Sequence, residues 1–268
     1  MNTNGHAWTG NGKQISNPAS IPFSIFHLLS SAAALVLLAG CASQPGHKGT
    51  AEAKRSSKIG VELQPLPDPA LQAAAAKPSA PFEGEGWHLM FDGKTLAGWR
   101  ETEFAGRGEV RCEPGMILLK MGDPFTGINW TNDFSKINYE VALDAMRVIG
   151  SDFFCGLTVP VGTNFCSLIV GGWGGSVVGI SSLDGADASE NETTKFMNFD
   201  QGRWYRIRLR VMEGKIQAWI DQDKVVDVVT TGKRISVRPG DIEMSKPFGL
   251  SAWETSAVLR EIKFRTVK

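Results

Sequence analysis

The clearest pattern along the chain is the alternation of apolar and polar residues between positions 203 and 221. Apolar side chains at positions 205, 207, 209 and 211 alternate with Arg206, Arg208 and Arg210. The dipeptide Glu213-Gly214 then leads into a second alternating run at positions 215–221. Because successive side chains of a strand point to opposite faces, the pattern predicts a β-hairpin with one apolar face and one polar face.

The polar face of this hairpin carries side chains that pair well across two strands. Register about the turn places Arg206 opposite Asp221, Arg208 opposite Trp219, and Arg210 opposite Gln217. We expect an ion pair at the first position and a cation–π contact at the second, each contributing about 0.5–1 kcal/mol. The face is either a solvated outer surface or the floor of a sugar groove, in which Arg208 and Trp219 contact the substrate.

Shorter runs of the same kind predict the remaining strands. They fall at residues 87–91, 110–112, 116–120, 136–148, 153–159, 166–170, 224–229, 248–253 and 258–267. Glycines and turn dipeptides separate them, and no apolar stripe with a helical period of 3.6 residues appears. The pattern therefore predicts an all-β sandwich.

The N-terminal 40 residues have the pattern of an export signal. Positions 25–39 are apolar but too few to span a membrane comfortably, and they end in Leu38-Ala39-Gly40-Cys41. This ending resembles the lipobox of bacterial lipoproteins, which implies cleavage before Cys41 and acylation of its thiol. Such a protein is extracytoplasmic and lipid-anchored to the cell envelope. Ala42 follows the acylated cysteine, and an alanine at this position resembles lipoproteins that are sent to the outer membrane. The alternative is a cytosolic protein with a buried Cys41.

Composition divides the rest of the chain into a tether and one domain. Residues 41–81 are rich in Ala, Pro, Ser, Gln and Lys, which cannot bury enough apolar surface to fold. Residues 82–268 are long enough for one well-cored domain. The 28 basic and 28 acidic side chains of the chain balance, so charge suggests neither nucleic acid nor an anionic membrane surface as a partner.

Three cysteines fall within the predicted domain, Cys112, Cys155 and Cys166. If the hairpin of residues 153–170 turns near Val161, Cys155 and Cys166 lie nearly opposite each other. An oxidising compartment would then join them in a cross-strand disulfide. Otherwise both are small apolar residues packed in a core strand.

The stretch 151–194 concentrates the side chains that a functional site needs. Trp173 has two glycines on each side, and such bare backbone suits a bend or close approach by a ligand, with the indole as a stacking platform. A dense acidic segment follows, with Asp187, Glu190, Asn191 and Glu192. If this segment is extended, the two glutamates lie on one face about 6.6 Å apart. The alternatives are a core tryptophan and an acidic turn capped by Asn191.

Histidine is scarce, which limits the kinds of metal site that the predicted domain can form. His88 is its only histidine, so a zinc site built from several histidines is excluded. Any divalent cation would have to bind oxygen atoms and would resemble calcium or magnesium. The candidate ligands are Asp152, Asp187, Glu190 and Glu192.

Several motifs, taken together and in order, resemble the 3-keto-disaccharide hydrolase domain family. They are Leu89-Met90-Phe91-Asp92-Gly93-Lys94-Thr95-Leu96-Ala97-Gly98-Trp99, Gly202-Arg203-Trp204-Tyr205, Trp219-Ile220-Asp221, Pro247-Phe248-Gly249, Trp253 and Leu259-Arg260. The resemblance covers about residues 86–265. It implies a concanavalin-like jelly-roll sandwich of two antiparallel sheets, exported and often lipid-anchored, that hydrolyses glycosidic bonds.

Three functions follow as hypotheses. The first is a hydrolase of (3-keto) di- or oligosaccharides, with Glu190, Glu192 or Asp187 as catalytic carboxylate. Trp173, Asn191, Asp152, Arg208 and Trp219 would contact the sugar. The second is a carbohydrate-binding, lectin-like module in which the same groove binds without turnover. The third is a surface scaffold that contacts other envelope components.

Overall fold

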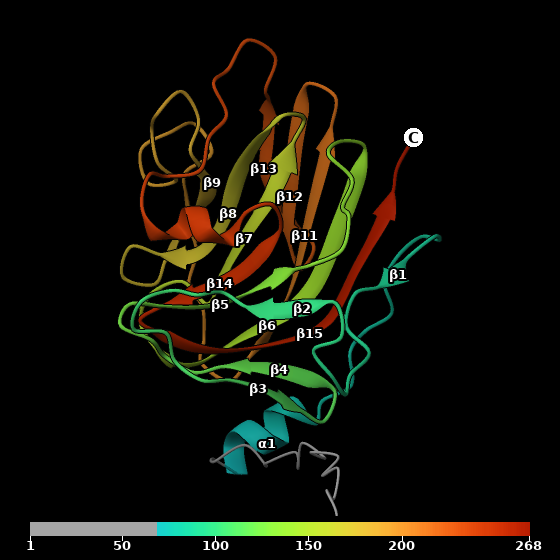
Figure 1. Cartoon of the computed structure of the whole chain (residues 1–268), viewed down its shortest axis with the longest axis vertical. Coiled ribbons are helices and arrows are strands. Elements are labelled where there is room, and N and C mark those ends of the chain that lie inside the picture. Colours follow the sequence, from blue (N-terminus) through green and yellow to red (C-terminus); the bar gives the residue numbers. More distant parts are fainter. Residues whose placement is uncertain (1–68) are drawn as a thin grey trace, which may run out of the picture. The chain divides into compact units, whose positions relative to one another are not determined.

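A computed structural model describes residues 69–268, which form two antiparallel β-sheets packed face to face (Figure 1). The predicted signal at residues 1–40, the acylation site at Cys41 and residues 42–68 of the predicted tether lie outside the described residues. Within the described part, no helix is both long and apolar enough to cross a membrane.

The first sheet, sheet A, has eight strands. Its order is β13 (Asp223–Val229), β12 (Lys215–Ile220), β11 (Trp204–Met212), β6 (Tyr139–Gly150), β15 (Thr255–Thr266), β4 (Met116–Leu119) and β3 (Val110–Glu113), with β1 (His88–Leu89) also paired to β15.

The second sheet, sheet B, has seven strands, in the order β10 (Lys195–Phe196), β9 (Val177–Ser181), β8 (Asn164–Gly172), β7 (Cys155–Val161), β14 (Gly249–Trp253), β5 (Phe125–Trp130) and β2 (Trp99–Glu101). The described helical elements are α1 (Pro69–Ala75) and the 3-10 helix η1 (Asp241–Ser245). The prediction of an all-β jelly-roll sandwich is confirmed.

The core lies between the sheets and follows directly from the alternation in the sequence. Ile207 and Leu209 of β11 are fully buried in the same cluster as Leu168 and Val170 of β8. Each strand therefore gives one set of side chains to the core and the other to an outer face.

The β11–β12 hairpin has the predicted register. Arg208 lies opposite Trp219 and Arg210 opposite Gln217, and the Arg208 guanidinium stacks on the Trp219 ring at 4.1 Å. The expected ion pair between Arg206 and Asp221 is wrong: the Arg206 backbone N–H donates to Asp221 Oδ1, while the Arg206 side chain points to another acid. Asp221 instead pairs with Arg203 at 2.8 Å.

The disulfide alternative for Cys155 and Cys166 is wrong, because the hairpin turns later than the pairing requires. Val161 pairs with Asn164, so Cys155 lies opposite Val170 and Cys166 opposite Val159. Both thiols are free and buried in the core, and burial raises the pKa of each to about 12. They act as small apolar side chains.

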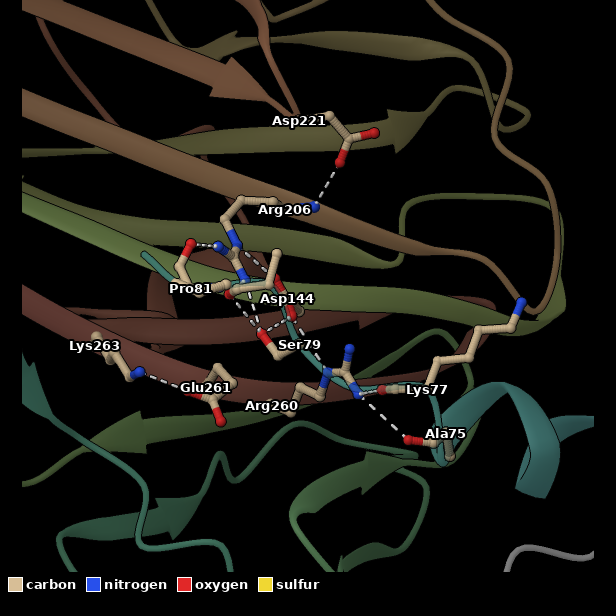
Figure 2. Close-up of polar contacts among 11 residues, drawn as sticks. Ala75, Lys77, Ser79, Pro81, Asp144, Arg206, Asp221, Arg260, Glu261 and Lys263 are labelled. Atoms are coloured by element: carbon tan, nitrogen blue, oxygen red, sulfur yellow. Dashed lines mark hydrogen bonds and ion pairs between the residues drawn. The ribbon is translucent and has the colours of Figure 1, made fainter. Parts of the chain in front are cut away.

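Strand β6 places a buried carboxylate, Asp144, on the outer face of sheet A. It accepts hydrogen bonds from Arg206 of β11 at 2.7 Å and from Arg260 of β15 at 3.2 Å (Figure 2). A buried carboxylate loses its hydration, so it is stable here because charged donors on both neighbouring strands replace the water.

A second buried carboxylate, Glu140, lies two repeats of the pleat away on the same strand and face. Arg210 and Arg265 donate to its Oε2 at 3.1 and 2.9 Å. Arg208 Nε lies 3.3 Å from Oε1 without hydrogen-bond geometry. Central strand β6 is therefore held to both of its neighbours by ion pairs as well as by the backbone ladder.

The arginines also hold residues 75–85, which span the end of the predicted tether and the start of the predicted domain and which we call the strap. Arg260 donates to the carbonyls of Ala75 and Lys77, and Arg206 donates to Ser79 Oγ and to the carbonyls of Ala80 and Pro81 (Figure 2). Arg265 donates to the carbonyls of Glu83 and Glu85. The structure thus differs from the expected tether, since its last residues lie on sheet A.

We expect Asp144→Ala to lower the free energy of unfolding by about 3–5 kcal/mol, because it leaves the buried Arg260 and the half-buried Arg206 without their anion. Urea unfolding followed by circular dichroism measures this. Asp227→Ala is the matched control, because Asp227 lies on the same sheet but is exposed, with Lys215 and Lys224 as partners. A loss for Asp144→Ala no larger than that of the control would contradict the role assigned to the buried pair.

Candidate functional site

The outer face of sheet B carries a cavity of about 440 Å³. On each strand its lining residues alternate with core residues: Ile169 of β8 lies between Leu168 and Val170, which face the sandwich core. Aromatic and apolar side chains form most of the wall, together with a few polar groups. The lining residues are Phe125, Asp152, Phe153, Ile169, Trp173, Ser181, Arg238, Pro239, Gly240, Asp241, Ile242 and Trp253.

Two indoles offer stacking surfaces in this cavity. Trp253, at the end of β14, packs edge-on against Phe125 with ring centroids 4.6 Å apart. Trp173 follows β8 and is 40% exposed, with a left-handed φ of 49°. A partly exposed indole beside apolar walls suits the CH face of a sugar ring.

Arg147 of β6 fixes the loops that carry Trp173 and Asp152. Its buried Nη2 donates to the carbonyls of Asp152, Gly171 and Gly175 at 3.0–3.2 Å. A Cβ at Gly171 would lie 2.6 Å from this nitrogen, so only glycine allows the approach. Burial lowers the pKa of Arg147, and the nearby Asp152 opposes that effect.

Asp152 links these two loops through its carboxylate. Its Oδ1 accepts the N–H of Phe153 at 2.7 Å, and its Oδ2 accepts the N–H of Gly174 at 2.9 Å. Because both oxygens accept backbone hydrogen bonds, the carboxylate orients the Trp173 loop beside the cavity. Asp152 therefore lies in the same cavity as Trp173, as the sequence predicted.

Asp187 lies at the margin of the cavity. It accepts hydrogen bonds from Ser181 and Ser182 at 3.1 and 2.9 Å and pairs with Arg238 at 3.2 Å. The Arg238 guanidinium also lies 5.8 Å from the Trp173 ring. Asp187 thus positions two residues of the cavity wall, Ser181 and Arg238.

Asp241 is the carboxylate of the cavity that remains unengaged. It lies at the first position of η1 and is exposed, and its side chain makes no hydrogen bond or ion pair with any residue in the described range. A carboxylate without protein partners in a concave, aromatic-walled site is free to accept a proton or a sugar hydroxyl.

The prediction that Glu190 and Glu192 share a cavity with Trp173 is wrong. Residues 188–193 form turns rather than an extended strand, so the two side chains do not share a face. Glu192 pairs with Lys233 at 2.5 Å, Glu190 is exposed, and neither lines the cavity. Asn191 donates to the carbonyls of Ile180, Ala186 and Asp187 and therefore holds the turn together.

The other predicted sugar contacts lie on the opposite sheet. Arg208 and Trp219 stack on each other on the outer face of sheet A, where Arg208 also pairs with Glu140. Next to them the strap and sheet A enclose a smaller cavity of about 270 Å³, which Arg208 lines. The structure therefore does not bring Arg208 or Trp219 together with Trp173.

The oxygen ligands that the sequence offers to a divalent cation do not gather at one point in the structure. Across residues 69–268, no three His, Cys, Asp or Glu side chains gather closely enough to hold a metal ion. Asp152 and Asp187 are engaged with protein donors, and Glu190 and Glu192 lie outside the cavity. His88 is exposed on β1, beside Phe264. The described side chains do not fit a divalent cation.

Sequence reasoning missed the segment 238–242, which forms one wall of the cavity. Arg238-Pro239-Gly240-Asp241 has the composition of a turn, and this turn carries both an acid and a cation. It lies far along the chain from Trp173, so no local pattern could have joined the two.

Comparison with known proteins places the chain in a family. The family model for the 3-keto-alpha-glucoside-1,2-lyase-like domain matches residues 86–268. No protein of curated function matches at a significant level.

Among solved structures, the chain is similar to a Bacillus subtilis protein of unknown function with a galectin-like fold. The identity is 10% and the TM-score 0.46, covering 67% of this chain and 94% of that one. It is also similar to the carbohydrate-binding module CBM66 from Bacillus subtilis, with 15% identity and a TM-score of 0.44, covering 63% and 96%. On the family match alone, the chain belongs to the 3-keto-alpha-glucoside-1,2-lyase-like domain family.

Proposed function

We propose that the domain binds a 3-keto di- or oligosaccharide in the sheet B cavity and cleaves its glycosidic bond. The observation that carries the proposal is the unengaged carboxylate of Asp241 in a cavity walled by Trp173 and Trp253. The family match supports an activity on 3-keto-glucosides.

The cavity supplies what is needed to orient a sugar ring. Its indoles contact the apolar face of the ring, while Arg238 offers hydrogen-bond donors to hydroxyl or carbonyl oxygens. Arg147 and Asp152 hold the Trp173 loop in place before the sugar arrives. Less ordering is then required on binding, which raises affinity.

The reaction requires a general base and a group that stabilises the enolate oxygen, and the cavity contains a candidate for each. The carbon next to the ketone has an acidic proton, which Asp241 accepts, and the electron pair left behind forms an enolate. Reformation of the ketone expels the glycosidic oxygen, which takes up a proton. Water then adds to the resulting double bond, and the sum is hydrolysis. Arg238 is the cation available to stabilise the enolate oxygen.

The second candidate is a carbohydrate-binding module without turnover. One observation favours it: Asp152 and Asp187 are committed to protein donors, so only Asp241 among these three carboxylates is unengaged. A glycosidase that acts directly on an ordinary glycosidic bond needs two carboxyl groups. Binding of ordinary and 3-keto sugars with equal affinity and without product would favour this function.

We expect Asp241→Asn to lower kcat on a 4-nitrophenyl 3-keto-α-glucoside by about 100-fold or more, because the amide cannot accept the proton. KM should change little, since the side chain keeps its shape. Release of nitrophenol measures both constants. Glu190→Gln is the matched control, because Glu190 is an exposed acid outside the cavity, and it should leave kcat unchanged. Full activity in Asp241→Asn, or an equal loss in the control, would remove Asp241 from the mechanism.

We expect Trp173→Ala to weaken sugar binding by about tenfold, as loss of one aromatic stacking partner costs about 0.5–1.5 kcal/mol beyond its buried area. Isothermal titration with an α-linked glucose disaccharide measures the affinity. Trp219→Ala removes an indole from the sheet A face and should leave the affinity as it is. The reverse result, with Trp219→Ala weakening binding and Trp173→Ala neutral, would place the sugar on sheet A.

A further inference from the structure

Sheet B carries a second cavity of about 440 Å³ at the other ends of the same strands. Strand β5 runs from Phe125 in the first cavity to Trp130 in the second, a distance of about 17 Å along the strand. Strand β8 likewise has Phe165 in the second cavity and Ile169 in the first. The two cavities therefore share strands β5 and β8, and Phe165 and Ile169, four residues apart, lie on the same face of β8.

One segment, residues 238–247, separates the cavities and borders both of them. Its first residues, from Arg238 to Ile242, line the first cavity, and Pro247 lines the second. Asn129 Nδ2 donates to the carbonyls of Met244 and Lys246, which holds η1 on β5. Because this segment is fixed to the sheet, it forms a ridge between the two cavities and does not fill either of them.

The ridge presents an apolar side chain between the two cavities. Met244 is 42% exposed, whereas Ile242 and Ser245 of the same helix are buried. An exposed thioether between aromatic-walled hollows continues the apolar surface that sugar CH faces contact.

The second cavity contains polar side chains that have no partner among the described residues. Trp130 and Phe165 give it aromatic walls, and Arg100, Asn132 and Lys136 line it. Within the described residues, these three side chains make no hydrogen bond or ion pair. Unengaged donors beside aromatic rings are what sugar hydroxyls need.

We propose that the second cavity is a distal subsite for the same sugar chain, so that the ligand is an oligosaccharide extending over Met244. This inference rests on the proposed function, since the first cavity must hold the reacting end. A disaccharide is shorter than the separation of about 17 Å between the two cavities, so a disaccharide in the first cavity leaves the second one empty. Longer chains gain contacts with Arg100, Lys136 and Phe165.

Isothermal titration of the purified protein with α-1,4-linked glucose chains of two to six units tests the subsite. Affinity should rise by about tenfold between the shortest and the longest chains, as one aromatic platform is added. Arg100→Ala and Lys136→Ala, both at exposed positions, should remove this gain and leave disaccharide affinity unchanged. Lys94→Ala removes an exposed cation outside both cavities and should retain the gain.

The outcomes separate the two proposals. Affinity that is independent of chain length, with disaccharide binding still lost in Trp173→Ala, overturns the subsite and leaves the proposed function standing. A gain that persists in both Arg100→Ala and Lys136→Ala also overturns the subsite. Failure of every chain to bind, with 3-keto-glucoside turnover also absent, counts against the proposed function itself.

Discussion

The pairing of buried carboxylates with arginines on β6 is the constraint on which the arrangement of the molecule depends. Asp144 and Glu140 lie on the central strand of sheet A, and either would be costly to bury alone. The arginines that neutralise them come from both neighbouring strands, and three of these arginines also hold the strap. Ion pairs and strap together cover much of this outer face, and among the described residues both cavities of about 440 Å³ lie on the other sheet.

The same strand also reaches the loops that border the sheet B cavity. Side chains at alternate positions of β6 point in opposite directions, so Asp144 faces the strap while Arg147 faces the loops of sheet B. Arg147 holds the backbone around Trp173, and Asp152 joins the two loops. Strand β6 thus contributes the paired acids on the outer face of sheet A. It also contributes Arg147, the buried cation that shapes the loops of the sheet B cavity.

The sequence predicts the parts of this structure that follow from local periodicity. Alternation gives the β11–β12 hairpin and its register, including the contact between Arg208 and Trp219. It does not fix turns to the nearest residue, and a turn placed too early made Cys155 and Cys166 appear opposite each other. The strap looks like a linker in the sequence because its main-chain carbonyls, rather than its side chains, make most of its contacts.

The candidate site was predicted only in part, for a related reason. Trp173 and Asp152 line the cavity, and they were singled out because glycines and acids cluster near them in the sequence. Asp187, predicted as a catalytic carboxylate, does not line it and contacts the wall residues Ser181 and Arg238 instead. Glu190 and Glu192 were assigned to the cavity on the assumption of an extended segment, whereas the chain turns there. Asp241 and Arg238 lie in a segment whose place beside Trp173 depends on the packing of η1 against β5 and β14, which no local pattern encodes.

The central claim is that sugar binds on sheet B while ion pairs and the strap cover sheet A. Hydrogen–deuterium exchange of the protein, with and without an α-linked gluco-oligosaccharide, tests it most directly. Exchange should slow in residues 150–155, 171–176 and 238–242 and stay unchanged in residues 203–221. Slowed exchange confined to residues 203–221 and the strap would contradict the account.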